Sequence, residues 1–549
     1  MSEFEYSKEL IKQRKFNDAL KILNKIKITG SHEKIYLEFG KSYMGIKEYD
    51  KAQKVLKKIV NDKNIVAMSI SLLLKIYAMT NCHSKVLRTY NKIKEVAVPT
   101  LEESDFAINS AIMLRKHKLA IKIAEDSKIS KEQIYRDIII YIQNLNKHDK
   151  YGKINKIFKD IYKLIPKQQK KFKNILLNEY EIANGIIFLR SKPRIVAVKL
   201  TSKCNLKCKM CYQGIDTKER KLSDKHCNEL LELMPYMERL ILQGGEVFLY
   251  NRFDEILQKA CDSNVSLEIV TNGLLLNETR IRQLINSNSE ITFSIDGFSK
   301  KTYESIRIGA NFDHLLNNLQ FISEYKKNIN NNATIRLQMV VMKSNYKEIE
   351  SAFDFAYRYN FDEVILIPIK SEKNISNDEY IFDVAFDQKI IKFLDNENRK
   401  WTKIMNNMGI ILKNYLPKIE FYSNVVNKNI KSLFPKNPKS VFDADILKSV
   451  QQHKKYHLKK LFCFMPWKAA YFADNSIVPT CFCPCNDDAG SAKSAQTILK
   501  DRKTSLINYW NSENMLYYRK AIIMNKYDRV CSQICINEKT SCVIKKNII

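Results

Sequence analysis

Three cysteines share one short segment near the middle of the 549-residue chain, at positions 204, 208 and 211. Thiolates are the ligands that iron–sulfur clusters prefer. A [4Fe–4S] cluster has four irons, so three thiolates leave one iron open to a small molecule. Zinc, the rival metal, usually takes four protein ligands, and this segment holds no fourth cysteine or histidine. Cys204, Cys208 and Cys211 are therefore predicted to hold a [4Fe–4S] cluster.

A short apolar run at residues 195–200 precedes the cysteines and is typical of a buried strand. Similar runs follow, separated by longer amphipathic stretches, at residues 239–242, 267–271, 291–295, 335–342 and 364–368. This alternation predicts repeated βα units around a parallel sheet. In parallel βα sheets, binding sites lie at the carboxyl ends of the strands, and the cysteines directly follow the first predicted strand.

The spacing Cys-x3-Cys-x2-Cys directly after a strand resembles the radical S-adenosylmethionine (SAM) superfamily. Gly244-Gly245-Glu246 resembles its GGE motif, and Thr271-Asn272-Gly273 and Ser294-Ile295-Asp296-Gly297 resemble later landmarks. The resemblance implies a partial (β/α)6 TIM-like barrel over residues 190–370, with SAM bound at the open iron. It also implies reductive cleavage of SAM to a 5′-deoxyadenosyl radical, which abstracts hydrogen from a C–H bond.

The same resemblance implies which residues contact SAM and what supplies the electron. Gly244, Gly245 and Glu246 would hold the amino group of SAM. Ser294 and Arg307 would bind its carboxylate, and Gln338 would lie near its ribose. Thr271 and Asn272 are further expected cofactor-binding residues. A reductase such as flavodoxin or ferredoxin is the expected electron donor.

Seven further cysteines gather in a predicted C-terminal domain over residues 456–549: Cys463, Cys481, Cys483, Cys485, Cys531, Cys535 and Cys542. A hairpin is predicted between the first two, with its turn at Asp474-Asn475-Ser476. The segment resembles the SPASM and twitch auxiliary-cluster extensions of the superfamily. That resemblance assigns Cys463, Cys481, Cys531 and Cys535 to a second [4Fe–4S] cluster. A zinc ribbon is the alternative, and metal binding by Cys483, Cys485 and Cys542 stays open.

Residues 1–185 carry an internal repeat. Ala19, Ala52, Val86, Ala120 and Ile154 are 33, 34, 34 and 34 positions apart, and each follows an aromatic or histidine ring by three residues. Helical apolar spacing follows each of them. This period is typical of the tetratricopeptide repeat, a helix–turn–helix unit that stacks into a solenoid. Between barrel and tail, residues 371–455 are predicted to form a helical linker region.

The chain carries a formal net charge of +32. We attribute it to lysine spread over a solvated surface, with attraction of an acidic peptide, a nucleotide or an anionic membrane as the alternative. We expect no nucleic-acid binding, because no basic motif is interleaved with aromatic residues. Neither a signal peptide nor a bilayer-spanning apolar run is found. We therefore expect a cytoplasmic protein whose 13 cysteines are thiols or metal ligands.

Three functions fit this organisation. The favoured one is a peptide- or protein-modifying enzyme, because a repeat array offers a concave surface for an extended peptide or a partner protein. The first alternative is a dehydrogenase or epimerase acting on a sugar or glycan precursor, with the repeats as a scaffold. The second is a non-catalytic repeat scaffold, against which the intact three-cysteine loop and the GGE motif argue.

Overall fold

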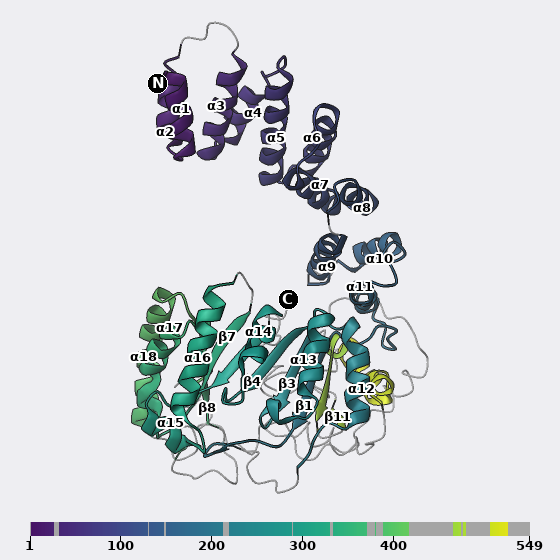
Figure 1. The fold of residues 1–549 in the computed structure, drawn as a ribbon. Helices are drawn as coiled ribbons and strands as arrows, with labels where there is room; N and C mark the ends of the chain where they lie inside the picture. Colours follow the sequence, from purple (N-terminus) through teal and green to yellow (C-terminus); the bar gives the residue numbers. More distant parts are fainter. Residues whose placement is uncertain are drawn as a thin grey trace. The chain divides into compact units, whose positions relative to one another are not determined.

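The computed structural model describes residues 2–26, 32–129, 131–147, 150–211, 219–287, 289–329, 333–369, 379, 388–416, 465–473, 476–478 and 505–524. The chain divides into two compact units, Met1–Ala183 and Asn184–Ile549 (Figure 1). The seven tail cysteines lie outside the described residues, so the predicted auxiliary metal site stays a prediction.

The first unit is built of helices. They are α1 (Glu3–Lys12), α2 (Phe16–Leu23), α3 (Glu33–Gly45), α4 (Tyr49–Leu56), α5 (Lys63–Met79), α6 (His83–Val96), α7 (Leu101–Met113), α8 (His117–Asp126), α9 (Lys131–Lys147), α10 (Tyr151–Ile161) and α11 (Lys170–Ala183). Each even-numbered helix begins at the ring residue of the predicted repeat. In the turns before α2, α4, α6 and α8, the residue two positions before the helix adopts the left-handed backbone conformation, with φ between 55° and 63°. These residues are Arg14, Lys47, Asn81 and Arg115.

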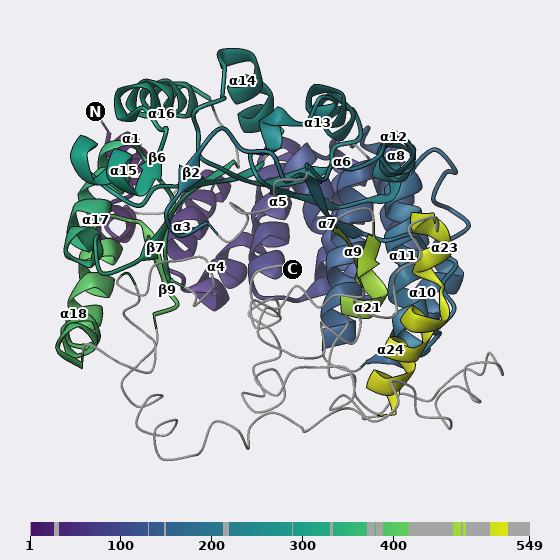
Figure 2. The same ribbon diagram turned by 90° about the horizontal axis from the view of Figure 1, so that it is seen from below.

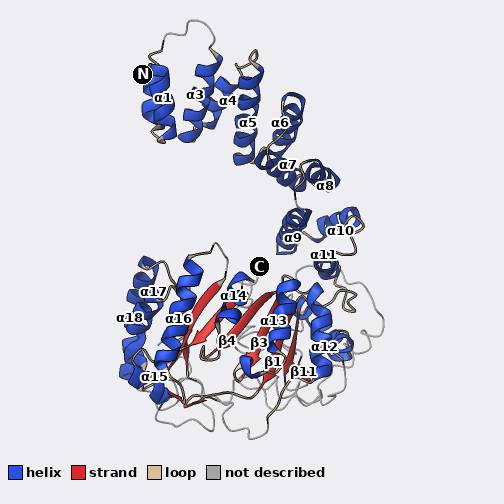
Figure 3. Cartoon of the chain, viewed as in Figure 1, coloured by secondary structure: helices blue, strands red, loops and turns tan. Residues whose placement is uncertain are grey.

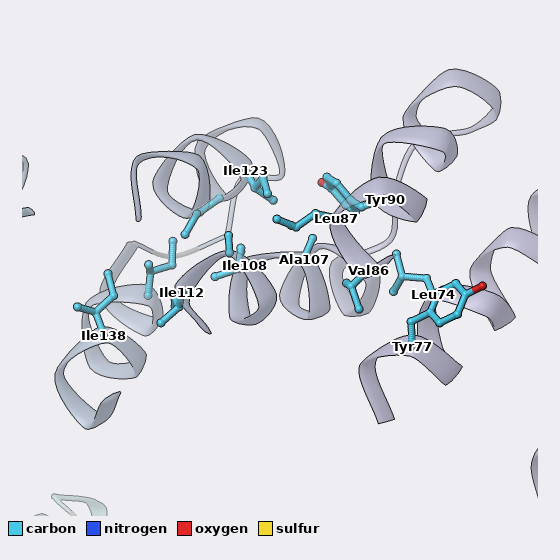
Figure 4. Packing of buried hydrophobic residues seen from close by; sticks show 14 of the residues in the cluster. Leu74, Tyr77, Val86, Leu87, Tyr90, Ala107, Ile108, Ile112, Ile123 and Ile138 are labelled. Atoms are coloured by element: carbon cyan, nitrogen blue, oxygen red, sulfur yellow. The ribbon is translucent and has the colours of Figure 1, made fainter. Parts of the chain in front are cut away.

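The core of this unit follows the same period. The five small or aliphatic residues of the repeat, Ala19, Ala52, Val86, Ala120 and Ile154, are fully buried. Figure 4 shows apolar side chains of successive helices meeting in one continuous core, from Leu74 in α5 to Ile138 in α9. Helix pairs thus recur at the predicted spacing, whereas the tetratricopeptide assignment itself stays a prediction.

The second unit contains a parallel sheet, drawn in red in Figure 3. Its strands are β1 (Ile195–Thr201), β3 (Arg239–Gly244), β4 (Ser266–Thr271), β5 (Glu290–Ser294), β7 (Thr334–Val341), β8 (Glu363–Pro368), β9 (Ile411–Asn414), β10 (Ala469–Ala473) and β11 (Ser476–Val478). The order is β11-β10-β1-β3-β4-β5-β7-β8-β9, and among these described strands only β10 and β11 pair antiparallel. The predicted parallel α/β core is confirmed.

Helices cover one face of this sheet (Figures 1 and 2). They are α12 (Asp224–Leu233), α13 (Phe253–Asp262), α14 (Glu278–Asn286), α15 (Lys300–Ile306), α16 (Phe312–Lys327), α17 (Ile349–Arg358) and α18 (Gln388–Asn407). Burial alternates along β7, where Ile335, Leu337 and Met339 are buried and Arg336 and Gln338 between them are half-buried. The strands therefore present a second, more polar face.

Charged side chains link the strands on that second face, near their amino ends. Arg239 pairs with Glu268 at 3.1 Å and with Glu290 at 2.6 Å. Arg336 pairs with Glu290 at 2.6 Å and with Glu363 at 2.7 Å. These side chains are at most 27% exposed, so the network cross-links β3, β4, β5, β7 and β8 away from solvent.

Two regions differ from their predicted secondary structure or placement. The predicted helical linker region, residues 371–455, contains α18 as expected but also β9, which extends the sheet beyond β8. The predicted hairpin is present as β10 and β11, and β10 pairs parallel with β1 at the edge of the sheet. A hydrophobic run of three to five residues predicts a strand but not the strand with which it pairs, so the position of β9, β10 and β11 in the sheet could not be predicted from the sequence.

The C-terminal helices α21 (Met465–Lys468), α23 (Leu506–Trp510) and α24 (Glu513–Ile523) are held by the segment that precedes β1. Trp467 Nε1 donates to the Ile186 carbonyl at 2.8 Å, and Trp510 Nε1 donates to the Ser191 carbonyl at 2.8 Å. This part of the tail therefore belongs to the second unit. Across the described residues, no helix has the length and apolar character needed to cross a membrane.

Candidate iron–sulfur and cofactor site

The three cysteines lie in the loop after β1, at the carboxyl edge of the sheet. Within this loop, β2 (Lys207–Cys208) pairs antiparallel with β6 (Arg307–Ile308). The N–H of Lys209 donates to the Ile306 carbonyl at 3.0 Å, and the N–H of Cys211 donates to the Cys208 carbonyl at 3.0 Å. A short two-stranded ladder thus holds the cysteine loop against the segment after α15.

The thiols have the chemistry of cluster ligands. Cys204 is exposed, and Cys208 and Cys211 are half-buried. Burial raises the pKa of Cys208 to about 11, although the Arg307 guanidinium acts in the opposite direction. As the side chains stand, no three His, Cys, Asp or Glu residues of the described segments converge as a metal site. Three thiols on one loop, close enough to influence one another's pKa, nevertheless fit a [4Fe–4S] cluster.

Two glycines clamp the chain just before the cysteine loop. Gly244 has φ of 143°, and a Cβ there would lie 2.3 Å from the Thr201 carbonyl oxygen. A Cβ on Gly245 would lie 2.2 Å from the Lys203 carbonyl oxygen. The N–H of Gly245 donates to the Thr201 carbonyl at 2.7 Å. Only glycine permits this approach of the end of β3 to the end of β1.

Gly245→Ala is expected to destabilise the second unit by more than about 2 kcal/mol, because the new methyl group meets backbone rather than a flexible side chain. It should also lower the iron bound after anaerobic reconstitution. Denaturant unfolding and iron analysis measure the two effects. Gly152→Ala is the matched control, since nothing lies within 4 Å of a Cβ there and α10 should tolerate it. Equal stability of the two variants would contradict the clamp.

A buried carboxylate connects the GGE segment with β4 and the cysteine loop. Glu246, 1% exposed, accepts from Thr271 Oγ1 at 2.8 Å and from the Asn272 N–H at 2.9 Å. Asn272 Nδ2 donates to Asn205 Oδ1, between the first two cysteines, at 2.8 Å. Burial raises the pKa of Glu246, and the two hydrogen bonds act against that shift. The structure therefore brings Glu246, Thr271 and Asn272 together, and it adds Asn205, which sequence reasoning did not single out.

The remaining predicted residues fall in two places. Ser294 and Gln338 are register partners on β5 and β7, and both are half-buried. Arg307 is 5% exposed and forms an ion pair with Asp296 Oδ2 at 2.5 Å, so its side chain lies in the interior beside Cys208. Lys199 and Gln243 are a further half-buried polar pair, on β1 and β3, that sequence reasoning missed. The sequence signal that could have indicated Lys199 and Gln243 is the presence of a polar residue within an otherwise apolar strand.

Three thiols on one loop at the carboxyl edge of a parallel βα sheet lie where α/β folds build their binding sites, and their chemistry suits an iron–sulfur cluster. Residues 198–356 match the Radical SAM superfamily, and the chain therefore contains a radical SAM domain. Members of this superfamily use a [4Fe–4S] cluster together with SAM, and these are the cofactors of the domain. The three cysteines, the two clamping glycines and Glu246 all lie within the matched range.

Several known proteins are similar to this chain. An uncharacterized protein of Archaeoglobus fulgidus is 26% identical over 30% of this chain and 38% of its own length. The tungsten-containing aldehyde ferredoxin oxidoreductase cofactor-modifying protein of Pyrococcus furiosus is 22% identical over 35% of this chain and 55% of its own length. The chain thus spans only part of these relatives. The structure of Streptococcus suis SuiB bound to S-adenosylmethionine gives a TM-score of 0.43 at 15% identity, covering 70% of this chain and 79% of SuiB.

Proposed function

We propose that this chain is a radical SAM enzyme that removes a hydrogen atom from a C–H bond of a peptide or protein substrate. The observation that carries the proposal is the three-cysteine loop, held at the carboxyl edge of the sheet by the Gly244–Gly245 clamp. When bound, the reduced cluster supplies one electron that cleaves SAM to methionine and a 5′-deoxyadenosyl radical.

The chain's own residues have three tasks in this proposal. Cys204, Cys208 and Cys211 hold three irons and leave the fourth for SAM. The segment at Gly244 offers carbonyl oxygens, and Glu246 a buried negative charge, to the ammonium group of SAM. Ser294, the last residue of β5, and its register partner Gln338 in the middle of β7 are proposed to contact its carboxylate and ribose. A flavodoxin- or ferredoxin-type reductase is the proposed electron donor.

The choice of a peptide substrate rests on the helical unit. Stacked helix pairs at a 34-residue spacing give an extended surface of the kind that binds peptides and partner proteins. Sugars or glycan precursors are the alternative substrates. The Pyrococcus furiosus relative is named a cofactor-modifying protein.

Deuterium transfer distinguishes the two substrate classes. The reduced enzyme and unlabelled SAM would be incubated with an extract of deuterated cells, separated into a macromolecular and a small-molecule fraction. Mass spectrometry of 5′-deoxyadenosine is expected to show deuterium with the macromolecular fraction. Deuterium only with the small-molecule fraction would replace the peptide proposal with its alternative.

An auxiliary [4Fe–4S] cluster bound by Cys463, Cys481, Cys531 and Cys535 is part of the proposal. Cys481→Ala should lower iron and acid-labile sulfide from about eight to about four per chain, and it should block product formation. Cleavage of SAM itself should persist, because the cluster at Cys208 stays intact. Unchanged iron together with loss of one zinc would favour a zinc ribbon.

A further inference from the structure

One cation lies against the cysteine loop from inside the second unit. Arg307 belongs to β6, which pairs with β2, so register places it opposite Cys208. Its Nη1 lies 3.7 Å from Cys208 Sγ, within hydrogen-bond range for sulfur, and its side chain is 6% exposed. An arginine guanidinium keeps its positive charge throughout the pH range in which proteins fold, and Asp296 supplies a counter-charge in direct contact with it. The group is therefore a permanent positive charge next to one ligand of the proposed cluster.

Asp296 holds that cation in place. Its carboxylate pairs through Oδ2 with Arg307 at 2.5 Å and accepts the Val340 N–H through Oδ1 at 2.7 Å. Asn345 Nδ2 donates to the Asp296 carbonyl at 2.9 Å. A Cβ on the next residue, Gly297, would lie 2.5 Å from the Tyr303 nitrogen, so the turn after β5 is tightly packed. The chain from β7 through Asp296 to Arg307 leaves the guanidinium little freedom to move.

Two further polar groups on the same segment are buried. Arg307 Nε and the Tyr303 hydroxyl are buried and have no hydrogen-bond partner within the described segments. Tyr303 is close enough to Cys208 for the two groups to affect each other electrostatically. A cluster with three thiolate ligands is an anion that gains one more negative charge on reduction. Positive charge and N–H donors at its sulfur ligands favour the reduced form.

We propose that Arg307, oriented by Asp296, is a positioning residue that raises the reduction potential of the cluster through the Cys208 ligand. The step is one-electron transfer from a flavodoxin- or ferredoxin-type donor to the oxidised cluster, with no bond made or broken and no proton taken up. The inference rests on the proposed function only in that Cys208 binds the cluster. It assigns Arg307 to the iron–sulfur group, in place of the SAM carboxylate suggested by sequence resemblance.

Two substitutions should move the potential in opposite directions. Arg307→Gln removes the cation and should lower the reduced fraction at a fixed potential by about tenfold, a shift of about 60 mV for one electron. Asp296→Asn leaves the cation without its counter-charge and should raise that fraction. Arg307→Lys keeps a charge without the fixed N–H geometry and should lie between wild type and Arg307→Gln. If the ion pair had only a structural role, the variants would lose stability, but their reduction potentials would not follow this order.

The experiment is an anaerobic redox titration of full-length protein, followed by electron paramagnetic resonance, with iron content and thermal unfolding recorded for every variant. The auxiliary signal is removed by making each change in the Cys481→Ala background. Potentials in the order Asp296→Asn, wild type, Arg307→Lys, Arg307→Gln support the inference. If Arg307→Gln assembles no cluster, the order of the other three still decides the question. Equal potentials, or a lowered potential for Asp296→Asn, overturn it, whereas a wild type without any cluster overturns the proposed function instead.

Discussion

Cys208→Ala is expected to abolish reductive cleavage of SAM while leaving the fold in place. Cys208 sits at the centre of the loop, in the strand paired with β6, and its side chain is only half-buried. Its backbone hydrogen bonds do not depend on the thiol, so the loss of stability should stay within about 1 kcal/mol. A [4Fe–4S] cluster left with two thiolates loses one of its three proposed ligands, and SAM then has no stable iron to bind.

Chromatographic measurement of 5′-deoxyadenosine under anaerobic, reducing conditions checks this expectation. Wild type should release it, and Cys208→Ala should release less than about a hundredth as much, because even the loss of a residue that only supports a metal ligand costs about 10–100-fold. Cys82→Ala, in the helical unit, is the matched thiol control and should behave as wild type. A normal yield of 5′-deoxyadenosine from Cys208→Ala would show that the three-cysteine loop is not needed for SAM cleavage.

Glu246→Ala is expected to have the second large effect, on both stability and SAM binding. The substitution leaves the Thr271 hydroxyl and the Asn272 N–H buried without their acceptor. Each unsatisfied buried donor costs about 1–3 kcal/mol. Because Asn272 also donates to Asn205, the cysteine loop loses part of its support. We expect the free energy of unfolding to fall by about 2–4 kcal/mol and SAM affinity to fall more than about tenfold.

Glu246→Gln separates the negative charge from the hydrogen bonds. Its amide oxygen can still accept the Asn272 N–H, so most of the stability should return. SAM affinity, measured by equilibrium dialysis with the reconstituted enzyme, should stay low if the carboxylate faces the ammonium group of SAM. Glu278→Gln, at the exposed start of α14, is the control for a lost carboxylate. Wild-type affinity in Glu246→Gln would limit Glu246 to a structural role.

The local parts of the site could be predicted from the sequence because each has a local cause. The apolar run at 195–200 leads directly into the three cysteines, and it is a strand in the structure. Gly244 and Gly245 follow a second such run, and their close contacts with Thr201 and Lys203 explain why glycine is needed. The repeat of the helical unit was equally visible, since each ring residue begins a helix.

Contacts between distant segments could not be predicted in the same way. The position of Arg307 beside Cys208 depends on the β2–β6 pairing, which joins segments about a hundred residues apart in the sequence. Hydrophobic periodicity predicts local elements and does not predict such a pairing. The pairing of β10 with β1 likewise joins the tail to the first strand of the sheet. Asn205 gave no signal because its partner, Asn272, lies at the end of β4. Such contacts are products of topology rather than of local pattern.

The most direct test of the account is the release of 5′-deoxyadenosine and methionine by the anaerobically reconstituted, reduced full-length chain. The account predicts that both products appear in equal amounts with wild type and that neither appears with a Cys204/Cys208/Cys211 triple-alanine variant. Absence of both products from a wild type that carries its full iron and sulfide would contradict the proposal that this chain cleaves SAM.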